Sequence, residues 1–292
     1  MYNFFKKIFK TNKKFTLKDS SFLKIYKSTE ISKLFDSISN FNDTSEIRYV
    51  GGCVRKILNQ EDVDDIDLAV NLNPNQVKEC LQSNNIKFFE TGIKHGTITA
   101  NIGQKNFEIT SLREDVDTDG RHANVRYTTD WLKDSSRRDF TINSIYADKD
   151  GNLFDPNGGA KDIEEGKVIF IGNADNRIQE DYLRILRYIR FFLLYSSQDH
   201  SNVTKKAIKK NISGVANLSK ERLLDELNKI FKPTLCFCWT SDRKHTTKKE
   251  KRNTLEFERW ISWYPSRYSC ICLLYTSDAA DEGLGVDLGG RR

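Results

Sequence analysis

Residues 47–70 read IRYVGGCVRKILNQEDVDDIDLAV, and this stretch decides the fold. Its first four residues predict a short strand that enters Gly51-Gly52, after which residues 53–58 open a helix. A second apolar strand is predicted over 66–70, bounded by acidic residues. A strand, a glycine turn, a helix and a second strand in this order favour an α/β fold.

The glycine pair and the helix after it form the first candidate site. A strand that ends in two glycines lets backbone amides approach a phosphate closely, because no Cβ intervenes. The helix N-terminus favours anions, and Arg55, one turn in, can form paired hydrogen bonds with phosphate oxygens. A glycine pair alone more often marks only a tight turn. Gly51, Gly52 and Arg55 are therefore candidate phosphate contacts that need support from neighbouring residues.

Two acids supply that support. Asp65 and Asp67 are two residues apart in the predicted strand, so their side chains share one face. Adjacent carboxylates repel each other, and a divalent cation bound between them relieves the repulsion. A solvated strand edge is the ordinary explanation of such a pair. The apolar strand and the upstream glycines favour the alternative, a Mg²⁺ site held by Asp65 and Asp67.

A second cluster lies in RRDFTIN, residues 137–143. Arginine suits a triphosphate, and Asp or Asn suits ribose hydroxyls. Arg138, Asp139 and Asn143 are therefore candidate nucleotide contacts. A surface salt-bridge cluster is the alternative for this motif taken alone.

A third cluster, EDYLRILRYIR over 180–190, predicts a helix whose charged residues are spaced by three: Asp181, Arg184, Arg187 and Arg190. Asp181 and Arg184 together offer an acceptor beside a donor. Cytosine and adenine present an amino donor next to a ring-nitrogen acceptor, whereas uracil and guanine present the reverse order. Such a pair would accept CTP and ATP, because a wrong base leaves buried polar groups unpaired. A solvated helix face could carry the same charges.

Composition limits the classes of protein. The 292 residues suffice for one large domain or two to three small ones. With 38% hydrophobic and 30% charged residues, and no apolar window of about 18 residues, the chain is typical of soluble proteins without a membrane partner. The net charge of +6 suits RNA or a nucleotide. The apolar run at the start is too short for a signal peptide, so we expect a cytoplasmic protein.

Residues 233–292 differ from the rest. They hold Cys236, Cys238, Cys270 and Cys272, but show no sustained period of 2 or 3.6. The two C-x-C pairs lack the spacing of a zinc ribbon. Residues 272–282 resemble the translated read-through of a sequencing adaptor. We expect 233–292 to follow a frame error, to be unstructured and to contribute no site.

The remaining pattern places an α/β part before an all-helical part, with the boundary near 172. Helices are predicted over 16–40 and 74–83, a polar loop over 113–129, and a hairpin at Asp150-Gly151. The other predicted strands are 88–90, 97–102, 107–111, 142–147, 153–154 and 168–171, and the later helices are 175–195, 201–211 and 219–231.

Several long motifs now coincide in order and spacing: GGCVR, DDIDLAV, TGIKHGTITA, FEITSLREDVDTDGRHANV, RRDFTINSIYAD, DPNGGAKDI and RIQEDYLRILRYIRF. Over about 45–231 the chain resembles the class II CCA-adding tRNA nucleotidyltransferase family, which includes bacterial poly(A) polymerases. The resemblance implies a mixed-sheet nucleotidyltransferase head over 45–172 and a helical neck over 173–232, after a basic helical extension over 1–44. Members continue into body and tail domains that hold the tRNA, and we expect these to be absent here.

The resemblance also implies roles for individual residues. Asp65 and Asp67 match the catalytic metal-binding acids, and Glu108 is an expected auxiliary carboxylate. Lys56 departs from the family, which usually has Asp there. The other matched residues are nucleotide contacts: Gly51, Gly52, Arg55, Arg138, Asp139, Asn143, Asp181, Arg184, Arg187 and Arg190.

The implied reaction is Mg²⁺-dependent transfer of nucleotides from CTP and ATP to the 3′ end of tRNA, with release of pyrophosphate. A bacterial poly(A) polymerase shares every motif quoted, although TGIKHGT favours the CCA-adding side. Enzymes that add only CC or only A remain alternatives. A different class is an inactive RNA-binding remnant, against which the intact Asp65 and Asp67 argue.

Overall fold

The computed structural model describes residues 20–63, 65–92, 96–118 and 123–241 and divides into two compact units. We call the first, which ends at Asp181 and includes Tyr195–Ser197, the head unit. The second, the neck unit, contains Tyr182–Leu194 and the chain from Gln198 onward. The units therefore divide after Asp181, later than the boundary expected near 172.

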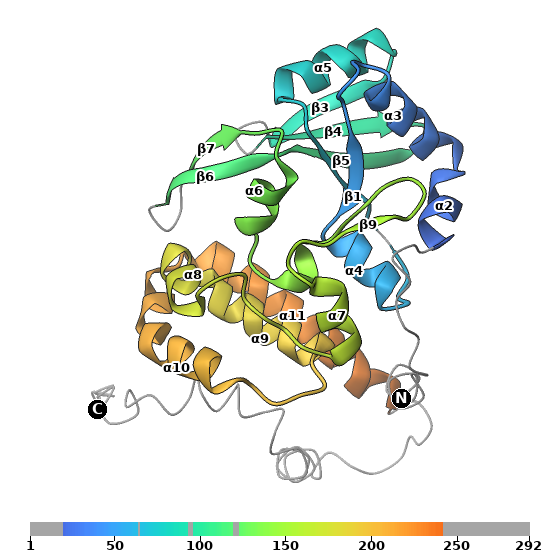
Figure 1. Cartoon of the computed structure of the whole chain (residues 1–292). Helices are drawn as coiled ribbons and strands as arrows, with labels where there is room; N and C mark the ends of the chain where they lie inside the picture. The colour runs from blue at the N-terminus through green and yellow to red at the C-terminus, as the bar shows by residue number, and fades with distance from the viewer. Residues whose placement is uncertain (1–19, 64, 93–95, 119–122, 242–292) are drawn as a thin grey trace, which may run out of the picture. The chain divides into compact units, whose positions relative to one another are not determined.

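A seven-stranded mixed sheet forms the head unit, as expected for the α/β fold class (Figure 1). Its spatial order is β3-β4-β5-β2-β1-β8-β9. β2 and β5 pair in parallel, and all the other neighbours are antiparallel. The strands are β1 Ile47–Val50, β2 Asp67–Val70, β3 Lys87–Gly92, β4 Thr97–Ile102, β5 Lys105–Ser111, β8 Tyr146–Ala147 and β9 Leu153–Phe154.

Helices α2 (Ser20–Tyr26), α3 (Thr29–Ser39) and α5 (Pro74–Ser83) pack together over the sheet, α5 against β3 and β4. The sequence predicted α5 to the residue, because Asn73 forms a capping box with Gln76 and Pro74 occupies the first helical position. A separate apolar cluster joins strands β1, β2 and β8 to Trp131 of α6 (Trp131–Ser136). These contacts fix the central strands that end at the candidate site.

The DPNGGAKDI motif begins helix α7 (Gly159–Glu165) and packs it against the 3₁₀ turn η2 (Thr141–Asn143). The Asp155 carboxylate accepts hydrogen bonds from the Gly159 and Ala160 amides, each at 2.8 Å. A Cβ on Gly159 would lie 2.0 Å from the Thr141 carbonyl oxygen, so only glycine permits this approach. The motif thereby fixes the turn that carries Asn143.

Three predicted elements of the head unit were wrong. The polar loop expected over 113–129 is a two-stranded antiparallel hairpin of β6 (Arg113–Thr118) and β7 (Ala123–Tyr127), separate from the main sheet (Figure 1). The strand expected over 142–147 begins with the end of the turn η2 and enters the sheet only at β8, and 168–171 contributes a single bridge from Phe170 to Phe140.

The helix expected over 175–195 is broken in two. α8 (Ala174–Glu180) ends in the head unit at Asp181, whose backbone is extended with φ −159° and ψ 107°. α9 (Leu183–Tyr195) begins after Tyr182. The Tyr182 ring packs so tightly on Gly214 that a Cβ there would lie 2.2 Å from it. Asp181 and Tyr182 therefore separate the two helices.

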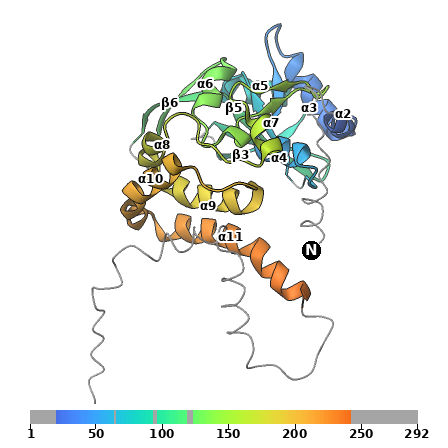
Figure 2. The same ribbon diagram turned by 60° about the horizontal axis from the view of Figure 1, so that its bottom comes forward.

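The neck unit is helical, as predicted. It holds α9, α10 (Asn202–Asn211), the 3₁₀ segment η3 (Ile212–Asn217) and α11 (Lys220–Ser241), and Figure 2 shows α9 and α11 side by side. The helical backbone of α11 continues through Pro233, where the sequence predicted an unstructured tail. The rest of that prediction, 242–292, lies outside the described residues. In the described part of the chain, no helix is long and apolar enough to cross a membrane.

Candidate functional site

The glycine turn lies where β1 ends and α4 (Gly52–Leu58) begins. Gly51 has a φ of +67°, a conformation that side chains other than hydrogen disfavour. A Cβ on Gly51 would lie 3.6 Å from Arg138 Nη1, and one on Gly52 would lie 3.5 Å from Asp67 Oδ2. The turn therefore presents bare backbone between a guanidinium and a carboxylate.

Asp67 is the first residue of β2 and is half-buried. Its partner in the parallel neighbouring strand β5 is Glu108, so two carboxylates lie side by side at the start of β2. Asp65 is exposed and precedes the strand, which corrects the expectation that both acids lie within it. It is still close enough to act electrostatically on Asp67. The structure thus brings Asp65, Asp67 and Glu108 together.

The charge on Asp67 is disfavoured by its surroundings. Burial raises the pKa of Asp67 above its usual range, Glu108 and Asp65 raise it further, and Arg138 and Arg55 oppose the shift. Among the described residues, no group of three or more His, Cys, Asp or Glu side chains is placed to hold a metal ion. Two carboxylates with an excess of negative charge nevertheless fit a divalent cation that takes its remaining ligands from phosphate oxygens.

Residues of the RRDFTIN motif also lie at the glycine turn and contact Arg55. Arg138 Nη1 donates to the Asn143 carbonyl oxygen at 3.4 Å. Arg55, which is buried, donates to the Asn143 side-chain oxygen. The Asn143 amide in turn donates to Asp139 at 3.0 Å. Asn143 therefore orients Arg55 beside the glycine turn, and Asp139 orients Asn143. This role is in addition to the nucleotide contact expected of both residues.

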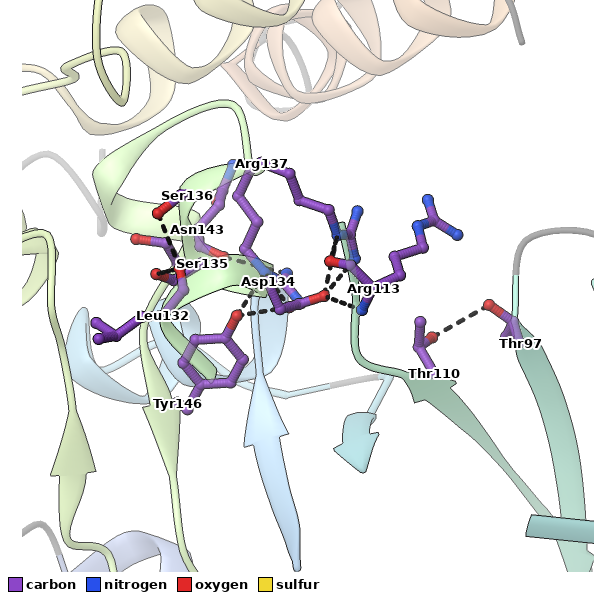
Figure 3. Close-up of polar contacts among 12 residues, drawn as sticks. Thr97, Thr110, Arg113, Leu132, Asp134, Ser135, Ser136, Arg137, Asn143 and Tyr146 are labelled. Atoms are coloured by element: carbon purple, nitrogen blue, oxygen red, sulfur yellow. Dashed lines mark hydrogen bonds and ion pairs between the residues drawn. The ribbon is translucent and has the colours of Figure 1, made fainter. Parts of the chain in front are cut away.

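Sequence reasoning missed Asp134, in α6. Its side chain is 1% exposed and pairs with both Arg137 at 2.7 Å and Arg138 at 3.1 Å (Figure 3). Burial opposes its ionisation, but the two guanidiniums and the Tyr146 hydroxyl hold the pKa of Asp134 below its usual range. An acid three and four residues before two arginines was the available signal.

The third cluster does not lie on one continuous helix. Asp181 lies at the extended end of α8, so the prediction that it shares a helix face with Arg184 is wrong. Arg184, Arg187 and Arg190 all lie in α9 and are half-exposed. Arg190 donates to Glu226 of α11, which is 2% exposed, and its guanidinium lies 4.2 Å from the Phe191 ring centre. Arg190 therefore has a structural partner within the neck unit.

Comparison with known families agrees with this division of the chain. A family model described as the Poly A polymerase head domain matches residues 47–169. A second, described as the probable RNA and SrmB-binding site of polymerase A, matches residues 201–233. The first covers the sheet, the glycine turn and RRDFTIN, and the second covers α10 and most of α11.

Individual relatives point the same way. The chain is 51% identical over 191 residues to human mitochondrial CCA tRNA nucleotidyltransferase 1, covering 64% of this chain and 44% of that protein. It is 38% identical over 187 residues to the CCA-adding enzyme of Oceanobacillus iheyensis, covering 63% and 45%. The chain thus spans less than half the length of these curated relatives.

Among solved structures, the CCA-adding enzyme of Bacillus stearothermophilus in complex with CTP is similar, with a TM-score of 0.61 and 29% identity over 69% of this chain and 48% of that one. The glycine turn, the paired carboxylates and the arginines of RRDFTIN all lie within the matched head. The two family models and these relatives agree: residues 47–169 match the Poly A polymerase head domain, residues 201–233 match the RNA-binding region of polymerase A, and the chain is similar to CCA-adding tRNA nucleotidyltransferases.

Proposed function

We propose that this chain transfers nucleotides from CTP and ATP to the 3′ end of tRNA and releases pyrophosphate. One observation carries the proposal: Asp67 and Glu108 are parallel-strand neighbours beside a glycine turn that also faces Arg55 and Arg138. This arrangement offers carboxylates for a cation and guanidiniums for a triphosphate. Human and bacterial relatives named for this activity add support.

The residues of the head unit divide the work. Backbone at Gly51 and Gly52 and the guanidiniums of Arg55 and Arg138 bind and orient the triphosphate. Asn143 keeps Arg55 in place. Positioning of this kind supplies much of the catalysis in phosphoryl-group transfer, because the reacting oxygens must be in line.

Asp65 and Asp67 would hold Mg²⁺, with Glu108 as an auxiliary carboxylate. When bound, the cation would lower the pKa of the attacking 3′ hydroxyl and neutralise triphosphate charge. The raised pKa of Asp67 supports this assignment, since a cation would stabilise the charge that burial and the neighbouring carboxylates disfavour.

Base selection is assigned to Asp181 and Arg184, one accepting from the exocyclic amine and the other donating to the ring nitrogen. Their residue types support this assignment, although they do not share a helix. We expect Asp181→Ala to let UTP or GTP compete, and Arg184→Ala to weaken CTP and ATP together. Incorporation of all four nucleotides by both variants tests it, and unchanged selectivity in both would place base reading elsewhere.

The RNA acceptor is assigned to the neck unit. α10 carries Lys205, Lys206, Lys209 and Lys210, and the RNA-binding family model covers this region. Cationic side chains contact phosphates without reading sequence, so they suit a generic hold on tRNA. The vertebrate relatives are named mitochondrial, which leaves the cytoplasmic location of this chain a prediction.

Supplying CTP alone, ATP alone and both to a tRNA that lacks CCA tests the function. We expect CTP alone to extend the acceptor by C residues, and both nucleotides to complete CCA. Repeated A from ATP alone would indicate a poly(A) polymerase, and growth limited to C or to a single A would indicate a partial enzyme. RNA binding without any incorporation would contradict the proposal and favour the inactive remnant.

A further inference from the structure

Asp134 carries a buried charge next to the candidate site, and the proposed chemistry gives it no task. Four groups donate to its two carboxylate oxygens: the Tyr146 hydroxyl, both following arginine side chains and the Arg113 amide. Asp134 lies in α6, and these groups come from the residues after α6, from the start of β6 and from β8 (Figure 3). A carboxylate enclosed in this way fixes the geometry of whatever it binds.

The two oxygens of Asp134 serve different partners. Oδ1 accepts from Arg137 Nη2 at 2.7 Å and from the Arg113 backbone amide at 3.1 Å. Arg137 Nε also donates to the Arg113 carbonyl oxygen at 3.0 Å. This side therefore attaches α6 to the first residue of the hairpin strand β6. It makes no contact with Arg138.

Oδ2 supports Arg138. It accepts from the Tyr146 hydroxyl at 2.6 Å, from Arg138 Nη2 at 3.1 Å and from Arg138 Nε at 3.3 Å. The Tyr146 oxygen also accepts from Arg138 Nε at 3.1 Å. Nε and Nη2, two of the three guanidinium nitrogens of Arg138, are thus bound by Asp134 and Tyr146.

The third nitrogen of Arg138 is directed elsewhere. Nη1 contacts the Asn143 carbonyl oxygen at 3.4 Å and lies 3.6 Å from the position of a Cβ on Gly51. Arg138 therefore meets the glycine turn with this edge of its guanidinium. The positive charge that Arg138 presents at this edge suits an anion at the turn.

We propose that Asp134 is a positioning residue that, together with the Tyr146 hydroxyl, orients Arg138 toward the triphosphate at the glycine turn. The inference rests on the proposed nucleotidyl transfer, because the nucleotide supplies the anion. The competing role is structural, in which Asp134 only joins α6, β6 and β8. A structural role lowers stability without changing nucleotide affinity, whereas a positioning role changes the KM for the nucleotide.

Tyr146→Phe is the sharpest test, because it keeps the buried ring and removes only the hydroxyl on the Oδ2 side. Steady-state kinetics on the full chain, with tRNA lacking CCA and varied CTP, should show a KM raised about tenfold, the size expected from a lost hydrogen bond to a charged group. The kcat should change far less than the KM, because the reacting oxygens remain aligned once the nucleotide is bound.

Arg137→Met is the matched control, since it breaks the Oδ1 side and leaves Oδ2 with Arg138. We expect it to lower the melting temperature and to leave the KM for CTP unchanged. Asp134→Asn should raise this KM more than Tyr146→Phe does, since both guanidiniums lose their anion. Should Asp134→Asn fail to fold, the other two variants decide.

An unchanged KM in Tyr146→Phe with a lowered melting temperature would overturn the inference, and so would equal increases in Tyr146→Phe and Arg137→Met. A wild-type chain that incorporates neither CTP nor ATP would instead contradict the proposed function. In that case the Kd for CTP by calorimetry replaces the KM, and the same comparison of variants decides.

Discussion

At the scale of single residues, Asp67 shows the conflict between stability and function most directly. Burial and the neighbouring carboxylates raise its pKa, so the folded protein disfavours the charged form that a cation site needs. Groups whose charge is disfavoured in this way are concentrated at functional sites, where a ligand later compensates them. The surroundings of Asp67 therefore make its replacement informative.

We expect Asp67→Asn to lower nucleotide incorporation by about a hundredfold or more, because one carboxylate ligand is lost. The melting temperature should stay the same or rise, because the amide removes repulsion with Glu108. Asp65→Asn should cause a similar loss of nucleotide incorporation, and the variant protein should still fold. Incorporation assays and thermal melts on the same preparations measure both effects.

Asp62→Asn serves as the control, since Asp62 is an exposed acid in the same loop. It should retain wild-type incorporation. Near-parental turnover by either Asp65→Asn or Asp67→Asn would refute the two-carboxylate site. A large drop in the melting temperature of Asp67→Asn would show that the residue is mainly structural.

At the scale of elements, α9 is held by polar side chains within the neck unit. Glu226 of α11 is buried and accepts from Arg190. His200 is 7% exposed, lies 3.0 Å from the Tyr188 hydroxyl through Nδ1 and stacks on the Phe192 ring. The helix that carries the predicted arginine row thus depends on two buried partners that no periodicity indicates.

We expect Arg190→Met to lower the free energy of unfolding by about 3 kcal/mol, because it leaves the Glu226 charge buried without its cation. The double variant Arg190→Met/Glu226→Leu should recover much of that loss. Urea unfolding of the wild type, both single variants and the double variant measures the coupling. If the losses of the two single variants add up to the loss of the double variant, the pair has no energetic link.

His200 predicts a pH dependence. Burial, with a smaller effect of Lys205, lowers its pKa to about 4, while Asp199 opposes the shift. Below the unfolded value near 6.5 only the unfolded state gains the proton, so stability falls from there down to about pH 4 and then levels, by up to about 3 kcal/mol in total.

His200→Phe should remove this contribution while keeping an aromatic ring against Phe192. The difference in unfolding free energy between wild type and variant, measured in urea from pH 3.5 to 7.5, isolates the histidine from the carboxylates that titrate nearby. A difference that does not vary with pH would show that His200 titrates normally in the folded chain.

At the scale of the whole molecule, a nucleotide that binds only the folded chain must raise its stability. At one hundred times the Kd the gain is about 2.7 kcal/mol, or a melting temperature higher by about 5–11 °C. We expect CTP with Mg²⁺ to produce this shift and EDTA to reduce it. Thermal melts with each nucleotide measure it, and UTP, which the proposed site rejects, provides the comparison. Equal shifts for CTP and UTP would contradict selective binding.

Much of the head unit could be predicted from the sequence, because its signals are local. Apolar runs marked the central strands, and the cap at Asn73 with Pro74 defined a helix to the residue. The glycine pair, Asp67 and the RRDFTIN motif were recognised from residue type and spacing, and the structure brings them together. Only a few residue types bind phosphates and cations, so these positions can be identified from the sequence.

Only the tertiary structure decided the features that depend on distant partners. The β6–β7 hairpin has no apolar alternation, and cross-strand pairs such as Glu114 with Arg126 support its pairing. The helix break at Asp181, next to the Tyr182 ring that packs on Gly214, has no signal in the charge spacing of residues 180–190. Asp134 and Glu226 look like ordinary surface acids until folding surrounds them with cations. Local sequence determines which elements form, whereas the energy of a buried charge depends on groups brought near it from elsewhere in the chain.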